Sequence, residues 1–199
     1  EDELLQMMDF IKKRKDEQMM SGTGGGDRQK NKNLARQAAK YLRKSDGPRV
    51  AVFEVNGFDT HAAQGGVDGT HTECLVEMDE IIQSLKENLK EAYKDTIIMT
   101  VTEFGRTIKQ NGGNGTEHGY GTAIFMAGGL LKKSQVHTDW PGLKKKEMYE
   151  GRDLNATIDA RSVYASAMST VFDLDFKRIQ KDVFWGEDLQ NLSDKLFKA

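Results

Sequence analysis

The stretch "ECLVEMDEIIQSLKENLKEAY", residues 73–93, decides the fold because it lies between two short apolar runs. Its apolar side chains recur at intervals of three and four residues, which predicts an amphipathic helix. The flanking runs, "RVAVFEV" at residues 49–55 and "DTIIMTVTEF" at residues 95–104, are rich in β-branched side chains and predict buried strands. A strand, a helix and a strand in this order predict a parallel sheet with right-handed crossovers.

The remaining patterns extend this prediction. The run "GTAIFMAGG", residues 121–129, predicts a third strand, and residues 33–44 and 159–174 have helical spacing. Residues 1–32 predict a separate helix followed by a flexible glycine-rich linker. The expected fold class is therefore α/β, a mostly parallel sheet with flanking helices.

Composition narrows the possible functions. The chain of 199 residues is 37% hydrophobic and 30% charged, which predicts one sizeable domain and no membrane span. Its 29 basic and 31 acidic side chains give a net charge of −2, so we expect no nucleic-acid partner. The single cysteine, Cys74, excludes an internal disulfide framework. The first residues, "EDELLQMMDF", contain neither an initiator methionine nor an export signal, so we expect a processed or incomplete chain.

Polar side chains follow the first two predicted strands. Asp59 and His61 come after the first strand, Glu103 stands at the end of the second, and Arg106 and His118 follow the second. Because ligands bind beyond the carboxyl ends of the strands in open α/β sheets, we expect these side chains to converge there. Carboxylates and imidazoles can hold a divalent metal ion, and an arginine can clamp an oxyanion.

Each of these residues also has a purely structural interpretation. Asp59 is suited to cap the turn that follows the strand, and Glu103 is suited to form an ion pair with Arg106. His71 and His137 lie in polar surroundings without companion ligands, and we expect them to be solvated. No Gly-x-Gly-x-x-Gly element opens a helix after a strand, which disfavours dinucleotide binding.

Five motifs resemble, in their order and spacing, one protein family. They are "GFDTHAAQ", "TEFGRTIKQNGGNGTEHG", "AIFMAGG", "DWPGL" and "GRDLNATIDARSVYASAM". The family is DUF1501, a group of sulfatase-like exported bacterial proteins, many of which carry twin-arginine signals. The resemblance covers residues 33–190. It implies an alkaline phosphatase-like fold and a location in the periplasm or cell envelope, with residues 33–199 as the C-terminal half of the domain. The missing N-terminal half would belong to the same protein or to another chain.

The resemblance also implies a function, the metal-dependent hydrolysis of phosphate or sulfate esters. Asp59, His61 and His118 would bind the ion, which would be zinc, manganese or calcium, and Glu103 and Arg106 would be catalytic. The partner would be a small anionic ester.

The sequence departs from the superfamily pattern in three ways. Asp59 and His61 are only two residues apart, Phe104 stands where a second histidine ligand is expected, and no nucleophile is recognisable in residues 1–32. The first two departures favour an alternative, a catalytically inactive hydrolase-like binding or assembly protein of the cell envelope.

Overall fold

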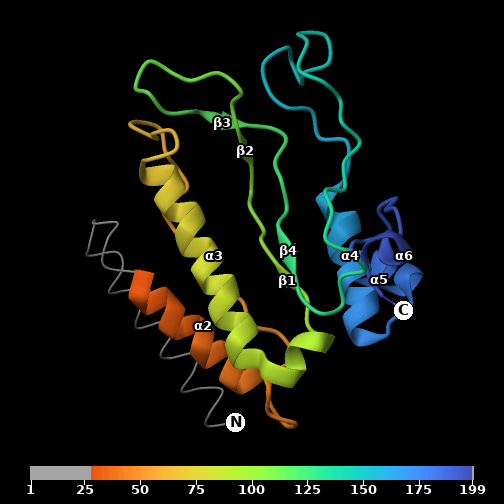
Figure 1. Cartoon of the computed structure of the whole chain (residues 1–199). Helices are drawn as coiled ribbons and strands as arrows, with labels where there is room; N and C mark the ends of the chain where they lie inside the picture. The colour runs from red at the N-terminus through yellow and green to blue at the C-terminus, as the bar shows by residue number, and fades with distance from the viewer. Residues whose placement is uncertain (1–27, 199) are drawn as a thin grey trace.

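The structure, a computed structural model, describes residues 28–198 (Figure 1). The predicted helix and linker of residues 1–32 therefore lie mostly outside the described residues. Residues 28–32 form the start of the first described helix, α2 (Arg28–Leu42).

Two parallel helices form the first part of the fold. α2 packs lengthwise against α3 (Thr70–Leu89), which continues into the 3-10 helix η1 (Lys90–Asp95) (Figure 1). Their shared core consists of Ala35, Ala39, Ile81, Leu85 and Leu89. The two alanines are fully buried, and their small side chains allow the helices to approach closely. The spacing of apolar residues had predicted both helices.

A long antiparallel ribbon follows the helices. Its strands are β1 (Ile98–Met99), β2 (Gly105–Arg106), β3 (His118–Gly119) and β4 (Met126–Ala127). β1 pairs with β4 and β2 pairs with β3, both in antiparallel register. The backbone N–H of Thr100 also donates to the carbonyl of Phe125, at 3.0 Å, and that of Thr107 donates to the carbonyl of Glu117, at 2.9 Å. The chain thus runs out along one arm, turns at residues 107–117 and returns along the other.

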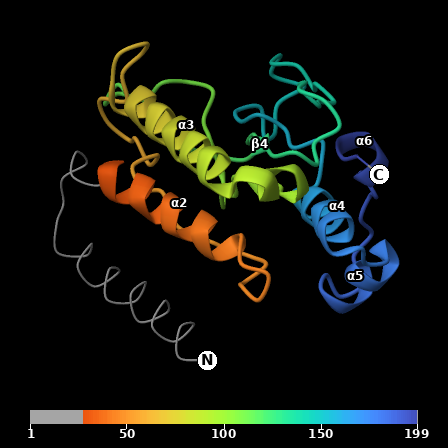
Figure 2. The same ribbon diagram turned by 60° about the horizontal axis from the view of Figure 1, so that its bottom comes forward.

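Three helices close the described chain (Figure 2). They are α4 (Ala160–Phe172), α5 (Phe176–Asp182) and α6 (Ser193–Leu196). Asp159 caps α4, since its carboxylate accepts a hydrogen bond from the backbone N–H of Arg161 at 2.8 Å. Val163 and Ala167 of α4 pack in one cluster with Met99 and Met126, so α4 covers the β1–β4 end of the ribbon.

The predicted fold class, a mostly parallel α/β sheet of the alkaline phosphatase-like type, is wrong. Residues 28–198 contain only two short strand pairs, and both are antiparallel. The runs at 95–104 and 121–129 were expected to be strands of a parallel sheet, but they are the two arms of one antiparallel ribbon. A parallel pair needs a crossover connection, usually a helix, and residues 105–120 contain none.

The first predicted strand, residues 49–55, is also absent from the described structure. This segment is an extended connection between α2 and α3 without strand assignment. Phe53 and Val55 pack against the core of the helix pair, while Val50 and Val52 are 58% and 83% exposed. The run is therefore buried on one side only, whereas a strand inside a parallel sheet is buried on both.

None of the helices in residues 28–198 is long and apolar enough to span a bilayer.

Candidate metal centre

The candidate site forms where the loop before α3 meets the tip of the ribbon. Ala62 and Asn114 form an isolated antiparallel bridge. The backbone N–H of Ala63 donates to the carbonyl of Gly113, and the N–H of Thr116 donates to that of Thr60. These contacts fix residues 59–64 against residues 113–116. The site is thus built by two docked loops and not by the carboxyl ends of parallel strands.

Gly115 makes this close docking possible. A Cβ atom at this position would lie 2.3 Å from the carbonyl carbon of His61 and 2.5 Å from the backbone oxygen of Thr60. Both contacts involve backbone atoms, which cannot turn aside as a flexible side chain can. Any larger residue would therefore separate the two loops.

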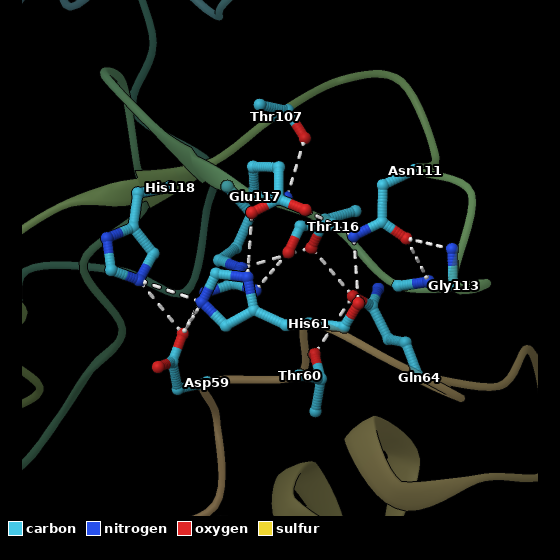
Figure 3. Close-up of polar contacts among 12 residues, drawn as sticks. Asp59, Thr60, His61, Gln64, Thr107, Asn111, Gly113, Thr116, Glu117 and His118 are labelled. Atoms are coloured by element: carbon cyan, nitrogen blue, oxygen red, sulfur yellow. Dashed lines mark hydrogen bonds and ion pairs between the residues drawn. The ribbon is translucent and has the colours of Figure 1, made fainter.

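Three potential metal ligands converge at this junction (Figure 3). The Nε2 atoms of His61 and His118 lie 3.1 Å apart. The Oδ1 atom of Asp59 lies 3.0 Å from the first nitrogen and 3.1 Å from the second. The family resemblance implied this ligand set, and the structure brings all three side chains together.

Glu117 orients one of these ligands. Its Oε2 atom lies 2.8 Å from Nδ1 of His61, on the opposite side of the ring from Asp59 and His118 (Figure 3). Asn111 in turn donates a hydrogen bond to Oε1 of Glu117 and another to the backbone oxygen of His61. Metal-binding histidines commonly donate their second ring N–H to a carboxylate in this way, which leaves the other nitrogen free to bind the metal.

Arg106 orients the carboxylate of Asp59. Its Nη1 atom donates to Oδ1 of Asp59, while Nε donates to the hydroxyl of Thr116 at 3.0 Å and Nη2 to the carbonyl of the same threonine. Arg106 lies on β2 directly opposite His118 on β3. The guanidinium is therefore anchored to the ribbon and holds Asp59 towards the histidines.

A second network of hydrogen bonds lies on the buried side of the three ligands. The Oε1 atom of Gln64 accepts hydrogen bonds from the hydroxyls of Thr60, at 2.9 Å, and Thr116, at 2.7 Å. Thr60 is only 5% exposed. A single amide thus ties the loop before α3 to the ribbon on the buried side of the site.

The two carboxylates of the site are ionised at neutral pH. Hydrogen bonding to the Arg106 guanidinium lowers the pKa of Asp59 below its ordinary value. Hydrogen bonds from Asn111 and His61 lower the pKa of Glu117. Ligand and supporting carboxylate therefore both carry the negative charge that stabilises a bound cation.

The ligand side chains face solvent. His61, His118 and Asp59 retain 42%, 50% and 59% of their side-chain exposure. Two surface hollows, one between α2 and η1 and one beside α5, are lined by other residues. The site is consequently an open face of the molecule and not a deep pocket.

Glu103 does not join the cluster. It is exposed, and among the contacts within residues 28–198 none links it to Asp59, His61 or His118. Its neighbour Phe104 stacks on the ring of His118, with centroids 3.9 Å apart and planes at 22°. Phe104, which stands where a second histidine ligand is expected, thus helps to orient the ring of His118.

The other histidines lie apart from the ligand set. His71 contacts Phe58 edge-on, and its Nδ1 atom is buried without a hydrogen-bond partner among the described residues, so it is not solvated as expected. His137 lies beside Gln135 in the loop that follows the ribbon.

The supporting residues were harder to find from sequence. Asn111 and Glu117 lie in the loop after the second predicted strand, but nothing in the sequence pattern assigns a role to them or to Thr60, Gln64 and Thr116. Glu117 directly precedes His118, and only the pairing of the two loops shows that it faces His61 instead.

A sequence model of the family described as "Protein of unknown function (DUF1501)" matches residues 2–181. No curated protein and no solved structure matches the chain. The family match includes both loops that form the site, the ribbon, and helices α2 to α4. Since it covers most of the sequence, the chain belongs to the DUF1501 family.

Proposed function

We propose that this protein is a metal-dependent hydrolase of phosphate or sulfate esters, with a divalent ion held by Asp59, His61 and His118. One observation carries the proposal. Three donor atoms, two from the loop before α3 and one from β3, meet within 3.1 Å of one another, and Glu117 directs the Nε2 atom of His61 towards the other two. This combination of ligands and supporting carboxylate is typical of catalytic metal sites.

The local charge supports an anionic substrate. Asp59 and Glu117 contribute two negative charges and Arg106 contributes one positive charge, so this group of side chains has a net charge of −1. A divalent cation makes the group net positive. The loaded site would then attract a phosphate or sulfate group, which is negatively charged at neutral pH.

The side chains have distinct roles in this proposal. A divalent ion supplies Lewis acidity and lowers the pKa of water at the site, so no protein nucleophile is required. Arg106 donates one N–H from each of its three nitrogens to Asp59 and Thr116. A guanidinium carries five N–H groups, which leaves two for the developing charge on the ester. We assign no role to Glu103, since it does not contact the ligands.

The experiment combines metal analysis with turnover. The purified protein, supplied with manganese or zinc, should hydrolyse 4-nitrophenyl phosphate or 4-nitrophenyl sulfate, and His118→Ala should abolish both metal retention and hydrolysis. His137→Ala removes a histidine outside the ligand set and is the matched control. Hydrolysis that persists in His118→Ala, at wild-type rate and with normal folding, would refute the site assignment.

A second candidate is a non-catalytic binding or assembly protein of the cell envelope. It is favoured by the open surface of the site and by the separation of Glu103, one of the two expected catalytic residues, from the ligands. Export of the protein to the cell envelope would be compatible with both the hydrolase and the binding protein. Bound metal in the wild-type protein, without hydrolysis of any aryl phosphate or sulfate, would favour this candidate over the hydrolase.

A further inference from the structure

The spacing of the three donor atoms carries information on the coordination number of the ion. We propose that the site holds a six-coordinate first-row ion of the manganese(II) or iron(II) type, with Asp59, His61 and His118 on one face of an octahedron. The opposite face would be open to a chelating anion. The inference rests on the metal site of the proposed function and specifies its geometry.

The donor atoms form a nearly equilateral triangle. Its sides are 3.0, 3.1 and 3.1 Å. If these sides are edges of a tetrahedron, the distance from donor to metal is about 1.9 Å, shorter than the usual zinc–nitrogen distance of about 2.0–2.1 Å. If they are edges of an octahedron, the distance is about 2.2 Å, within the range of six-coordinate divalent ions, which begins at about 2.0–2.1 Å for magnesium. An octahedral site accommodates the triangle as it stands, whereas a tetrahedral zinc site would require its sides to lengthen by about 0.2–0.4 Å.

The described part of the chain supplies no further ligand for the remaining coordination positions of the ion. Within residues 28–198, the ligand group consists of Asp59, His61 and His118 alone. Glu117 and Arg106 approach these residues from the side of the ribbon and bind the ligands themselves. The ligand side chains are about half exposed, so the remaining positions face solvent.

The chemical character of the ligands agrees with six coordination. Two imidazoles and one carboxylate on a single face, with open positions opposite, are typical of six-coordinate iron(II) sites in proteins. Three adjacent open positions would accept two oxygens of one phosphate or sulfate group together with water. A four-coordinate ion would leave only one position and would bind such a group through a single oxygen.

Cobalt(II) absorption spectroscopy distinguishes the two geometries without relying on activity. Cobalt(II) absorbs weakly in the visible range when six-coordinate and much more strongly when four-coordinate. Titration of the whole protein with cobalt(II) should give one bound ion with weak bands. Addition of inorganic phosphate should change the spectrum and leave the ion bound.

Variants link this signal to the proposed ligands. His118→Ala should weaken cobalt binding by more than about 100-fold, because loss of a mere supporting residue already costs about 10–100-fold. His137→Ala should bind as the wild type does, and circular dichroism should verify that both variants are folded. Binding that remains unchanged in His118→Ala would overturn the ligand assignment.

The possible failures are separable. A one-to-one complex with strong visible bands would overturn six coordination and leave the hydrolase proposal intact. Failure of cobalt(II), manganese(II) and zinc(II) to bind at all would overturn both.

Discussion

The Nδ1 atom of His61 lies 2.8 Å from the Oε2 atom of Glu117, although 56 positions separate the two residues in sequence. In a neutral imidazole whose Nδ1–H is donated to this carboxylate, Nε2 carries no proton and can bind an ion on the side of Asp59 and His118. The contact therefore determines which nitrogen can bind an ion.

Glu117→Gln should reduce metal affinity without removing a ligand. The amide can still form a hydrogen bond with His61, but it lacks the negative charge that makes the imidazole a stronger donor. We expect the dissociation constant for manganese(II) to rise by about 10–100-fold, measured by isothermal titration calorimetry. Glu103→Gln removes the same charge from an exposed residue outside the cluster and should change the constant little. Equal effects of the two substitutions would contradict the supporting role of Glu117.

Arg106→Lys should also weaken metal binding, even though it preserves the charge. A lysine ammonium cannot reach Asp59 and both oxygens of Thr116 at once, as the forked guanidinium does. Asp59 would then lose its fixed orientation, and we expect a loss of about tenfold in affinity. Arg36→Lys, on the exposed surface of α2, is the control. An unchanged affinity in Arg106→Lys would show that charge alone matters at this position.

Gly115→Ala should destabilise the protein and weaken the metal site. Its methyl group would lie 2.3–2.5 Å from backbone atoms of Thr60 and His61 and would separate the loops. Overpacking of this kind costs about 1–3 kcal/mol of unfolding free energy, which a thermal or urea denaturation would detect. Gly112→Ala, in the same loop, meets no atom within 4 Å and should be tolerated. If both variants were equally stable, the docking of the two loops would be wrong.

Acid should weaken the contact between α2 and α3. Arg28 forms two hydrogen bonds to the carboxylate of Glu80, and this bonding lowers the pKa of Glu80 below its ordinary 4.5. A lowered pKa in the folded state means that the pair contributes stability above about pH 4.5. The contribution is lost as the pH falls through the folded-state pKa.

Glu80→Gln should therefore be less stable than the wild type at pH 7, and the difference should shrink as the pH falls below 4.5. Urea denaturation at several pH values would measure it. Glu87→Gln, an exposed position on the same helix, is the control. A difference that grows towards acid pH would contradict the sign derived from the ion pair.

The helices could be predicted because their evidence is local. In α2, α3 and α4 the apolar side chains recur with helical spacing, and each helix buries that stripe. The strands could not be predicted in the same way. Apolar runs such as residues 49–55 indicate extended chain, but the partner and direction of a strand depend on contacts far away in sequence.

The site could be predicted only in part. Asp59, His61 and His118 follow predicted strands, and the family resemblance implies that they bind the metal. They do converge, although through the pairing of a loop with a ribbon tip rather than at the end of a sheet. Glu103 lies at the end of a predicted strand, but this strand is one arm of the ribbon, and Glu103 does not contact the three ligands.

The docking of residues 59–64 on the ribbon tip has a consequence for the order of assembly. The loop before α3 and the ribbon are both needed to bring the three donor atoms together, so the complete ligand set cannot form before these two units have met. We therefore expect tight binding of the ion to be a late folding event. In a refolding experiment, the helical circular dichroism signal should return before the visible absorption of bound cobalt(II). Removal of the ion by a chelator should increase amide-proton exchange at the ribbon tip and leave exchange in α2 and α3 largely unchanged.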